Sequence, residues 1–253
     1  VAGTTAVQRN FTLFNFGNVT ALSEAQLETF GNTNGVTAFQ RVEDGVWDPA
    51  NPRDFYFVTT ASFTGTSRLW RMRFNDIANP ENGGVIDMLL DGTEGIKMMD
   101  NIGIDADGNL LIQEDVGNQA HNGKTWKYVV ATDSLVLVSQ HRPNLVTTGQ
   151  PGFLTQDEEA SGIVDVSGIL GYRAYLIADQ FHTTAGIPAG LNTTELRENG
   201  QLQLLVEVAN GAYTLVAANN NGSVTSAVAN VNIIAPPAVG DTLFRTGLPG
   251  ATV

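Results

Sequence analysis

The sequence predicts an all-β fold made of β-propeller blades, and three observations support that prediction. Short runs of aromatic and β-branched residues recur along the chain, as in half-buried strands. Asn-Gly and Asp-Gly pairs, which favour tight turns, separate many of these runs. Acidic clusters begin at Glu43, Asp100 and Asp157, so they recur at intervals of 57 residues. A repeat of this length with several strands is typical of a propeller blade, although strands and turns also repeat by chance in a β-sandwich.

The repeat length decides how much of a propeller the chain can supply. At 57 residues per unit the 253 residues hold about three to four blades, whereas a closed propeller needs about four to eight. An open arc of blades leaves sheet edges exposed. We therefore expect the chain to be part of a larger propeller, continued in a longer polypeptide or completed by another protein chain.

The N-terminal segment, residues 1–37, is predicted to hold a strand and a short helix. The strand is expected near residues 11–16. The helix follows Ser23, because Ser23 and Gln26 have the spacing of a capping box. Residues 38–208 are expected to form the blades, with strands at 55–60, 69–74, 109–113, 125–130, 135–138, 174–178 and 202–208.

The C-terminal part differs from the blades. Residues 209–236 are predicted to form a β-hairpin, and the run from Tyr213 to Ser223 has an immunoglobulin-like pattern. Pro236 and Pro237 end the pairing because proline cannot donate to a strand ladder. Residues 237–253 are expected to form a loose C-terminal tail.

Composition excludes several classes of function. The net charge of −13 argues against a nucleic-acid-binding protein, which needs a basic face, and is compatible with bound cations. The absence of cysteine excludes disulfides, Cys-ligated zinc and a cysteine nucleophile within this chain. No apolar run is long enough for a membrane span. Because the first residue is Val, we expect a mature form, a fragment or part of something longer.

The acidic clusters are the candidate metal site. Solvated turns are the ordinary place for such residues, but these clusters recur at similar places in successive units, where a propeller would bring them together at its channel. Converging carboxylates repel one another unless a cation lies between them, and oxygen ligands suit Ca²⁺ or Mg²⁺. The candidate ligands are Glu43, Asp44, Asp100, Glu114, Asp115, Glu158, Glu159 and Asp179.

The remaining motifs give little support for any other kind of functional site. The three histidines lack the spacing of a zinc site, although His182 closely follows Asp179. No nucleophile elbow or phosphate-binding loop is present. The acidic run from Asp105 to Asn109 resembles half of an EF-hand loop, but it lacks the distal Glu and is better interpreted as a hairpin turn.

Several motifs together resemble the PhoX-type alkaline phosphatase family, in order, over about residues 38–205. The clearest is Arg41-Val-Glu-Asp-Gly-Val-Trp-Asp-Pro49, in which Val42 stands where the family has proline. The others are Asp54–Thr60, Arg68–Trp70, Met99–Asn101, Asn109–Asn118, Asp157–Asp165 and Asp179–His182. No cysteine corresponds to the family's iron ligand.

The resemblance implies an exported six-bladed propeller that hydrolyses phosphomonoesters with iron and calcium in its channel, and this chain would correspond to the C-terminal half of that propeller. By motif, Arg41 would bind the substrate phosphate and Glu43 would bind metal, which makes these two the catalytic candidates. The cofactors it implies are calcium and iron, the partner is a phosphate-ester small molecule, and the location is secreted, periplasmic or extracellular.

Two further functions remain open. The chain could be a non-catalytic, calcium-stabilised extracellular structural or binding module, as the immunoglobulin-like tail favours. It could also bind a sugar or other ligand through Trp47, Trp70 and Trp126, although tryptophans of blades usually belong to the core.

Overall fold

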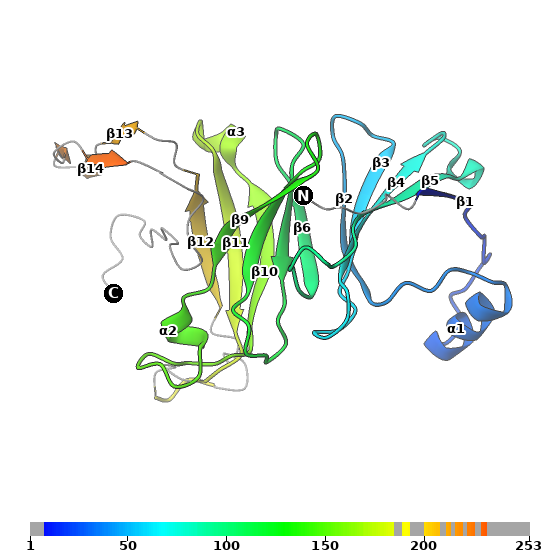
Figure 1. Cartoon of the computed structure of the whole chain (residues 1–253), viewed down its shortest axis with the longest axis horizontal. Coiled ribbons are helices and arrows are strands. Elements are labelled where there is room, and N and C mark those ends of the chain that lie inside the picture. The colour runs from blue at the N-terminus through cyan, green and yellow to red at the C-terminus, as the bar shows by residue number, and fades with distance from the viewer. Residues whose placement is uncertain are drawn as a thin grey trace.

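The computed structural model describes residues 8–184, 189–192 and 200–207, together with the backbone of four short strands between Gly211 and Val231. Within these residues the fold is all-β, as predicted, with three antiparallel sheets in a row and only short helices (Figure 1). Helix α1 (Glu24–Thr33) begins after Ser23, which forms the predicted capping box with Gln26. The other helices are η1 (Pro80–Asn82), α2 (Pro143–Val146) and α3 (Ser167–Leu170). In the described part of the chain no helix is long and apolar enough to cross a membrane.

Sheet 1 has five antiparallel strands in the order β1-β5-β4-β3-β2. The strands are β1 (Gln8–Phe11), β2 (Val42–Trp47), β3 (Asp54–Thr59), β4 (Arg68–Phe74) and β5 (Gly84–Leu90). Strand β1 belongs to the predicted N-terminal segment, and its pairing with β5 makes it the outermost strand of the sheet.

Sheet 2 is a four-stranded meander and sheet 3 has three described strands. Sheet 2 runs in the order β6-β7-β8-β9, and its strands are β6 (Met99–Ile104), β7 (Leu110–Glu114), β8 (Lys124–Val129) and β9 (Ser134–Gln140). Residues Asp105–Asn109 form the predicted turn between β6 and β7, closed by the Asp105 carboxylate, which accepts backbone N–H bonds. Sheet 3 contains β10 (Glu158–Asp165), β11 (Ala174–Phe181) and β12 (Gln201–Val206).

The C-terminal strands pair among themselves. Strand β14 (Val216–Asn219) pairs with β15 (Gly222–Thr225) as the expected hairpin, and β13 (Gly211–Tyr213) pairs with β16 (Ala229–Val231). The tail predicted for residues 237–253 lies outside the described residues. The number of blades and the immunoglobulin-like character of the hairpin stay predictions.

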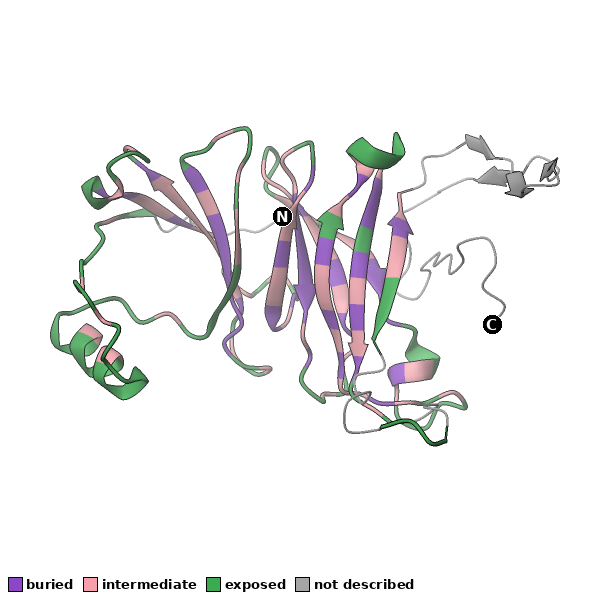
Figure 2. Ribbon diagram, turned by 180° about the vertical axis from the view of Figure 1, so that it is seen from behind, coloured by how far each residue is buried: buried purple, intermediate pink, exposed green. Residues whose placement is uncertain are grey.

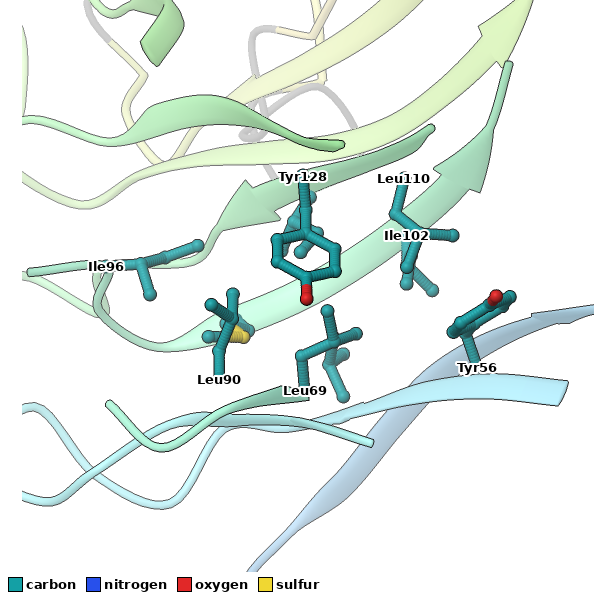
Figure 3. Close-up of a cluster of buried hydrophobic side chains, with 10 residues drawn as sticks. Tyr56, Leu69, Leu90, Ile96, Ile102, Leu110 and Tyr128 are labelled. Carbon is teal, nitrogen blue, oxygen red and sulfur yellow. The ribbon is translucent and has the colours of Figure 1, made fainter. Parts of the chain in front are cut away.

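Two apolar cores join the three sheets. The larger lies between sheets 1 and 2 (Figure 3) and consists of Tyr56, Val58, Leu69, Leu90, Ile96, Met99, Ile102, Leu110, Ile112 and Tyr128. The smaller lies between sheets 2 and 3 and consists of Leu111, Ile163, Tyr175, Ile177 and Leu205. Burying such side chains contributes roughly 1.5–3 kcal/mol each, so these cores are what holds the row of sheets together. Figure 2 shows buried residues concentrated in the strands of all three sheets.

Within the row, β6 lies between β2 and β10, so one edge strand from each of the three sheets lies beside the next. We call β2, β6 and β10 the inner strands. The sequence did not predict them as strands, nor β5. The acidic clusters were expected at strand ends, whereas Glu43, Asp100 and Glu159 lie within the inner strands themselves. Glycine and acidic residues are depleted in strands, and this hid the inner strands from a propensity argument.

Candidate functional site

Each inner strand carries a β-bulge. The pairing of β2 with β3 shifts between Val42 and Gly45, that of β6 with β7 between Met99 and Ile102, and that of β10 with β11 between Ala160 and Gly162. A bulge bends the strand and re-aims side chains out of the regular alternation. The residues inserted at the bulges are Glu43 and Asp44 in β2, Asp100 and Asn101 in β6, and Ser161 in β10.

The bulges also link one inner strand to the next. The Asp44 carboxylate accepts a hydrogen bond from the backbone N–H of Ile102 at 3.1 Å. The Asn101 side-chain amide donates to the carbonyl of Ala160 at 3.3 Å. Each of these hydrogen bonds connects a bulge residue to the neighbouring inner strand, so β2 is bonded to β6 and β6 to β10.

Arg41 stands at the start of β2 in a left-handed conformation, with φ of 57°. Its carbonyl accepts a bond from the N–H of Thr60, and its guanidinium makes two long contacts of 3.4 Å, to Glu43 and to the Ala61 carbonyl. Met98 has the matching conformation before β6, with φ of 44°. A left-handed residue other than glycine costs about 1–3 kcal/mol, and one stands directly before each of two inner strands, β2 and β6. Half of the Arg41 side chain is exposed.

Asp100 is the most perturbed carboxyl of this region. Burial raises its pKa first, and the charges of Glu43, Asp115 and Glu159 raise it further, whereas Arg41 lowers it; the result is a pKa of about 7. These four charged neighbours come from β2, β10 and the end of β7, and Asp115 forms a β-bridge with Glu159. We call Arg41, Glu43, Asp100, Asp115 and Glu159 the bulge site.

The sheet 3 side of the bulge site has its own polar contacts. Glu159 accepts a short hydrogen bond from Ser161, which in turn accepts one from Gln180 at 2.7 Å. His182 lies 3.6 Å from Glu159, and its backbone N–H donates to the Asp157 carbonyl. The histidine noted in the sequence therefore lies beside Glu159.

Three of the predicted ligands lie elsewhere, buried within the sheets: Glu114, Glu158 and Asp179. The Glu114 carboxylate accepts bonds from the indole of Trp126 and the backbone N–H groups of Lys97 and Lys124, and it lies 2.8 Å from His121. These partners satisfy the hydrogen-bonding capacity of the Glu114 carboxylate within the protein.

Glu158 and Asp179 enclose His141. The His141 ring lies 3.1 Å from Asp179 and 3.6 Å from Glu158, and all three side chains are buried. Burial by itself lowers the pKa of His141, but the hydrogen bond to Asp179 and the nearby Glu158 carboxylate outweigh burial and raise the pKa to about 9. At neutral pH the group is therefore a buried imidazolium between two carboxylates, joining the end of β9 to β10 and β11.

The alternation of a strand explains why the acidic pairs divide. Successive side chains point to opposite faces, so Glu114 and Glu158 turn into the interior while Asp115 and Glu159 turn to the bulge site. In the sequence each pair forms one cluster. Nothing in the sequence indicates that His141 pairs with buried carboxylates or that Asn101 and Ser161 bridge strands, because these contacts depend on the fold and no local pattern marks a bulge.

The bulge site has the donor chemistry of a hard-cation site, since carboxylate oxygens are the ligands that Ca²⁺ prefers. Among the described residues, however, no three Asp, Glu or His side chains are placed to hold one metal ion. The described residues therefore do not form a metal site by themselves. The predicted calcium and iron stay predictions.

Comparisons with known proteins give structural similarity but no matching family. No protein-family model matches the chain, and no curated protein matches it. Among solved structures it is similar to PhoX of Pseudomonas fluorescens in complex with vanadate, a transition state analogue, with a TM-score of 0.44 and 16% identity. The similarity covers 71% of this chain and 35% of that chain, so the chain spans about a third of that protein's length.

Proposed function

We propose that the chain is the phosphate-binding part of a secreted, metal-dependent phosphomonoesterase. The observation that carries the proposal is the convergence of Arg41 with carboxylates from all three sheets at the bulge site. Arg41 and Glu43 are also the residues that the family resemblance names for phosphate and metal.

Arg41 would bind the phosphate group. A guanidinium presents several N–H donors in a plane and pairs with two phosphate oxygens at once. The two contacts that Arg41 makes within the protein are long, at 3.4 Å, and half of its side chain is exposed. Such a side chain can exchange Glu43 for a phosphate oxygen at small cost.

The carboxylates of the bulge site would hold a divalent cation together with other ligands. Burial, and after it the crowded charges of Glu43, Asp115 and Glu159, raise the pKa of Asp100 to about 7. A cation would relieve this crowding, and the ligands that the described residues do not supply would come from water or from another segment. A bound cation would neutralise phosphate charge beside Arg41.

The test measures binding and hydrolysis together. We expect the chain, supplied with Ca²⁺ and Fe, to bind inorganic phosphate in calorimetry and to hydrolyse p-nitrophenyl phosphate. Arg41→Ala should abolish hydrolysis and weaken phosphate binding at least tenfold, while the melting temperature stays nearly unchanged. Arg9→Ala is the matched control, because Arg9 lies exposed on β1, the outermost strand of the same sheet.

Two results would contradict the proposal. One is a wild-type chain that neither binds phosphate nor hydrolyses the ester with metals present. The other is a collapse of the melting temperature in Arg41→Ala, which would make the Arg41–Glu43 pair structural.

A calcium-stabilised structural module is the second candidate. It is favoured by the bonds from Asp44 and Asn101 to the next inner strands, because these side chains fasten sheets together. For such a module calcium would raise the melting temperature, and Arg41→Ala would leave that rise intact in a chain without hydrolytic activity.

A further inference from the structure

The alternation of side chains gives each sheet two different faces. In β7, Leu110 and Ile112 belong to the core shared with sheet 1, whereas Leu111 between them belongs to the core shared with sheet 3. Each sheet thus has a rear face, toward the preceding sheet, and a forward face, toward the next. Both contacts within the row are of one kind, a forward face packed on a rear face.

The forward face of sheet 3 is apolar and exposed. Tyr175 and Ile177 point to sheet 2, so Leu176 and Ala178 point the other way. Cross-strand partners extend this face on both sides, and it consists of Val164, Leu176, Ala178, Leu202 and Leu204. Val164 is 62% exposed and Leu202 75%. Among the described residues no other sheet packs on it.

The rear face of sheet 1 is aromatic. Tyr56 and Val58 point to sheet 2, so Phe55 and Phe57 lie on the opposite side. The face consists of Trp47, Phe55, Phe57, Trp70 and Met72, and its rings lie 5.0–6.2 Å apart between centroids. Phe39 covers part of it, at 5.3 Å from both Phe57 and Trp70, while Trp47 remains 45% exposed. In the described part of the chain no sheet lies against this face.

We infer that the forward face of sheet 3 in one molecule packs on the rear face of sheet 1 in a second copy of this chain. One chain therefore carries both halves of a contact that it already makes twice internally. The ten residues named for the two faces are aliphatic or aromatic, and Arg9 and Arg68 lie on the rear face beside them. Exposed apolar surfaces of this kind mark interaction sites.

The contact is heterologous, so its geometry decides the number of copies. Head-to-tail contacts produce a ring when the rotation closes. Two copies bring together six sheets, within the range of about four to eight that closed propellers contain. A two-copy ring buries both exposed faces of both molecules.

Light scattering coupled to size exclusion, at several protein concentrations, tests the inference. We expect the 253-residue chain to elute above its monomer mass of 26.9 kDa, at twice that mass for a two-copy ring. Leu202→Asp and Trp47→Asp should each weaken self-association at least tenfold, because each places a charge in every contact. Val136→Asp should have no effect, since Val136 is 42% exposed on β9, in the middle sheet.

Mixing the two variants distinguishes a head-to-tail contact from a symmetric one. Leu202→Asp keeps an intact rear face and Trp47→Asp an intact forward face, so the mixture should form a heterodimer that neither variant forms alone. Circular dichroism must show both variants folded, and Val164→Asp replaces Leu202→Asp if the latter unfolds.

A wild-type chain that stays monomeric at every concentration would overturn the inference. Association that survives these substitutions, or a mixture that does not associate, would overturn it as well.

Discussion

His141 shows how a single residue can join two sheets. It carries a positive charge between Glu158 and Asp179, and none of the three side chains reaches solvent. Removing one partner from a buried ionic group leaves the others uncompensated, which costs about 3–5 kcal/mol. We expect His141→Gln to lose about that much stability at pH 7, measured by urea unfolding in the presence of a chelator.

The pH dependence of the free energy of unfolding provides a second test of the role of His141. Its pKa is raised in the folded protein to about 9, above the ordinary value of 6.5. The folded state therefore binds the proton more tightly, so this contribution is complete below about pH 6.5 and is lost as the pH rises through 9. The free energy of unfolding of the wild type should fall across this window more steeply than that of His141→Gln. Parallel curves would mean that the imidazole is neutral in the folded protein.

At the scale of the element, the close approach of β6 to β10 depends on a glycine. A Cβ atom at Gly103 would lie 2.9 Å from the Ile163 backbone oxygen and 3.3 Å from its side chain. Backbone cannot move aside as a flexible side chain does, so Gly103→Ala should cost about 1–3 kcal/mol. At roughly 2–4 °C per kcal/mol, a thermal melt resolves this loss.

Gly168→Ala is the matched control for Gly103→Ala. Gly168 lies in α3, and a Cβ there meets nothing within 4 Å. Its replacement should leave the melting temperature unchanged or raise it slightly, because alanine favours a helix. Equal losses in the two variants would show that the spacing of β6 and β10 does not depend on Gly103.

The strands also show what the sequence could predict. Those with short runs of aromatic and β-branched residues, such as β3, β4 and β8, were predicted from their own residues. The inner strands were not, because they owe their conformation to neighbouring strands rather than to propensity. Arg41, Glu43 and Asp100 were identified as candidates and the structure brings them together, whereas Glu114 and Asp179 lie apart because the direction of a side chain depends on register.

At the scale of the whole molecule, the net charge of −13 makes cations the natural stabilising ligands. We expect Ca²⁺ to raise stability by about 2.7 kcal/mol at one hundred times its dissociation constant. Replacing Glu43 and Glu159 together by Gln should remove this gain, as measured by melting with calcium or chelator. The control pair is Glu24 and Glu28, on the exposed helix α1. A gain that survives the first pair of substitutions would place the cation elsewhere.

The bulges of the inner strands have a consequence for how this chain can vary in length. Two residues, Glu43 and Asp44, face a single residue of β3, so the side chains before and after them are out of step by one position. Deleting either residue would restore unbroken pairing, with Val42 still opposite Thr59 and Gly45 still opposite Phe57, and would remove the bulge that directs the remaining acidic side chain. A substitution there removes one functional group, but a one-residue deletion removes the bulge as well. Natural variants of this chain should therefore differ at residues 43–44 and 100–101 by replacement, with the spacing preserved.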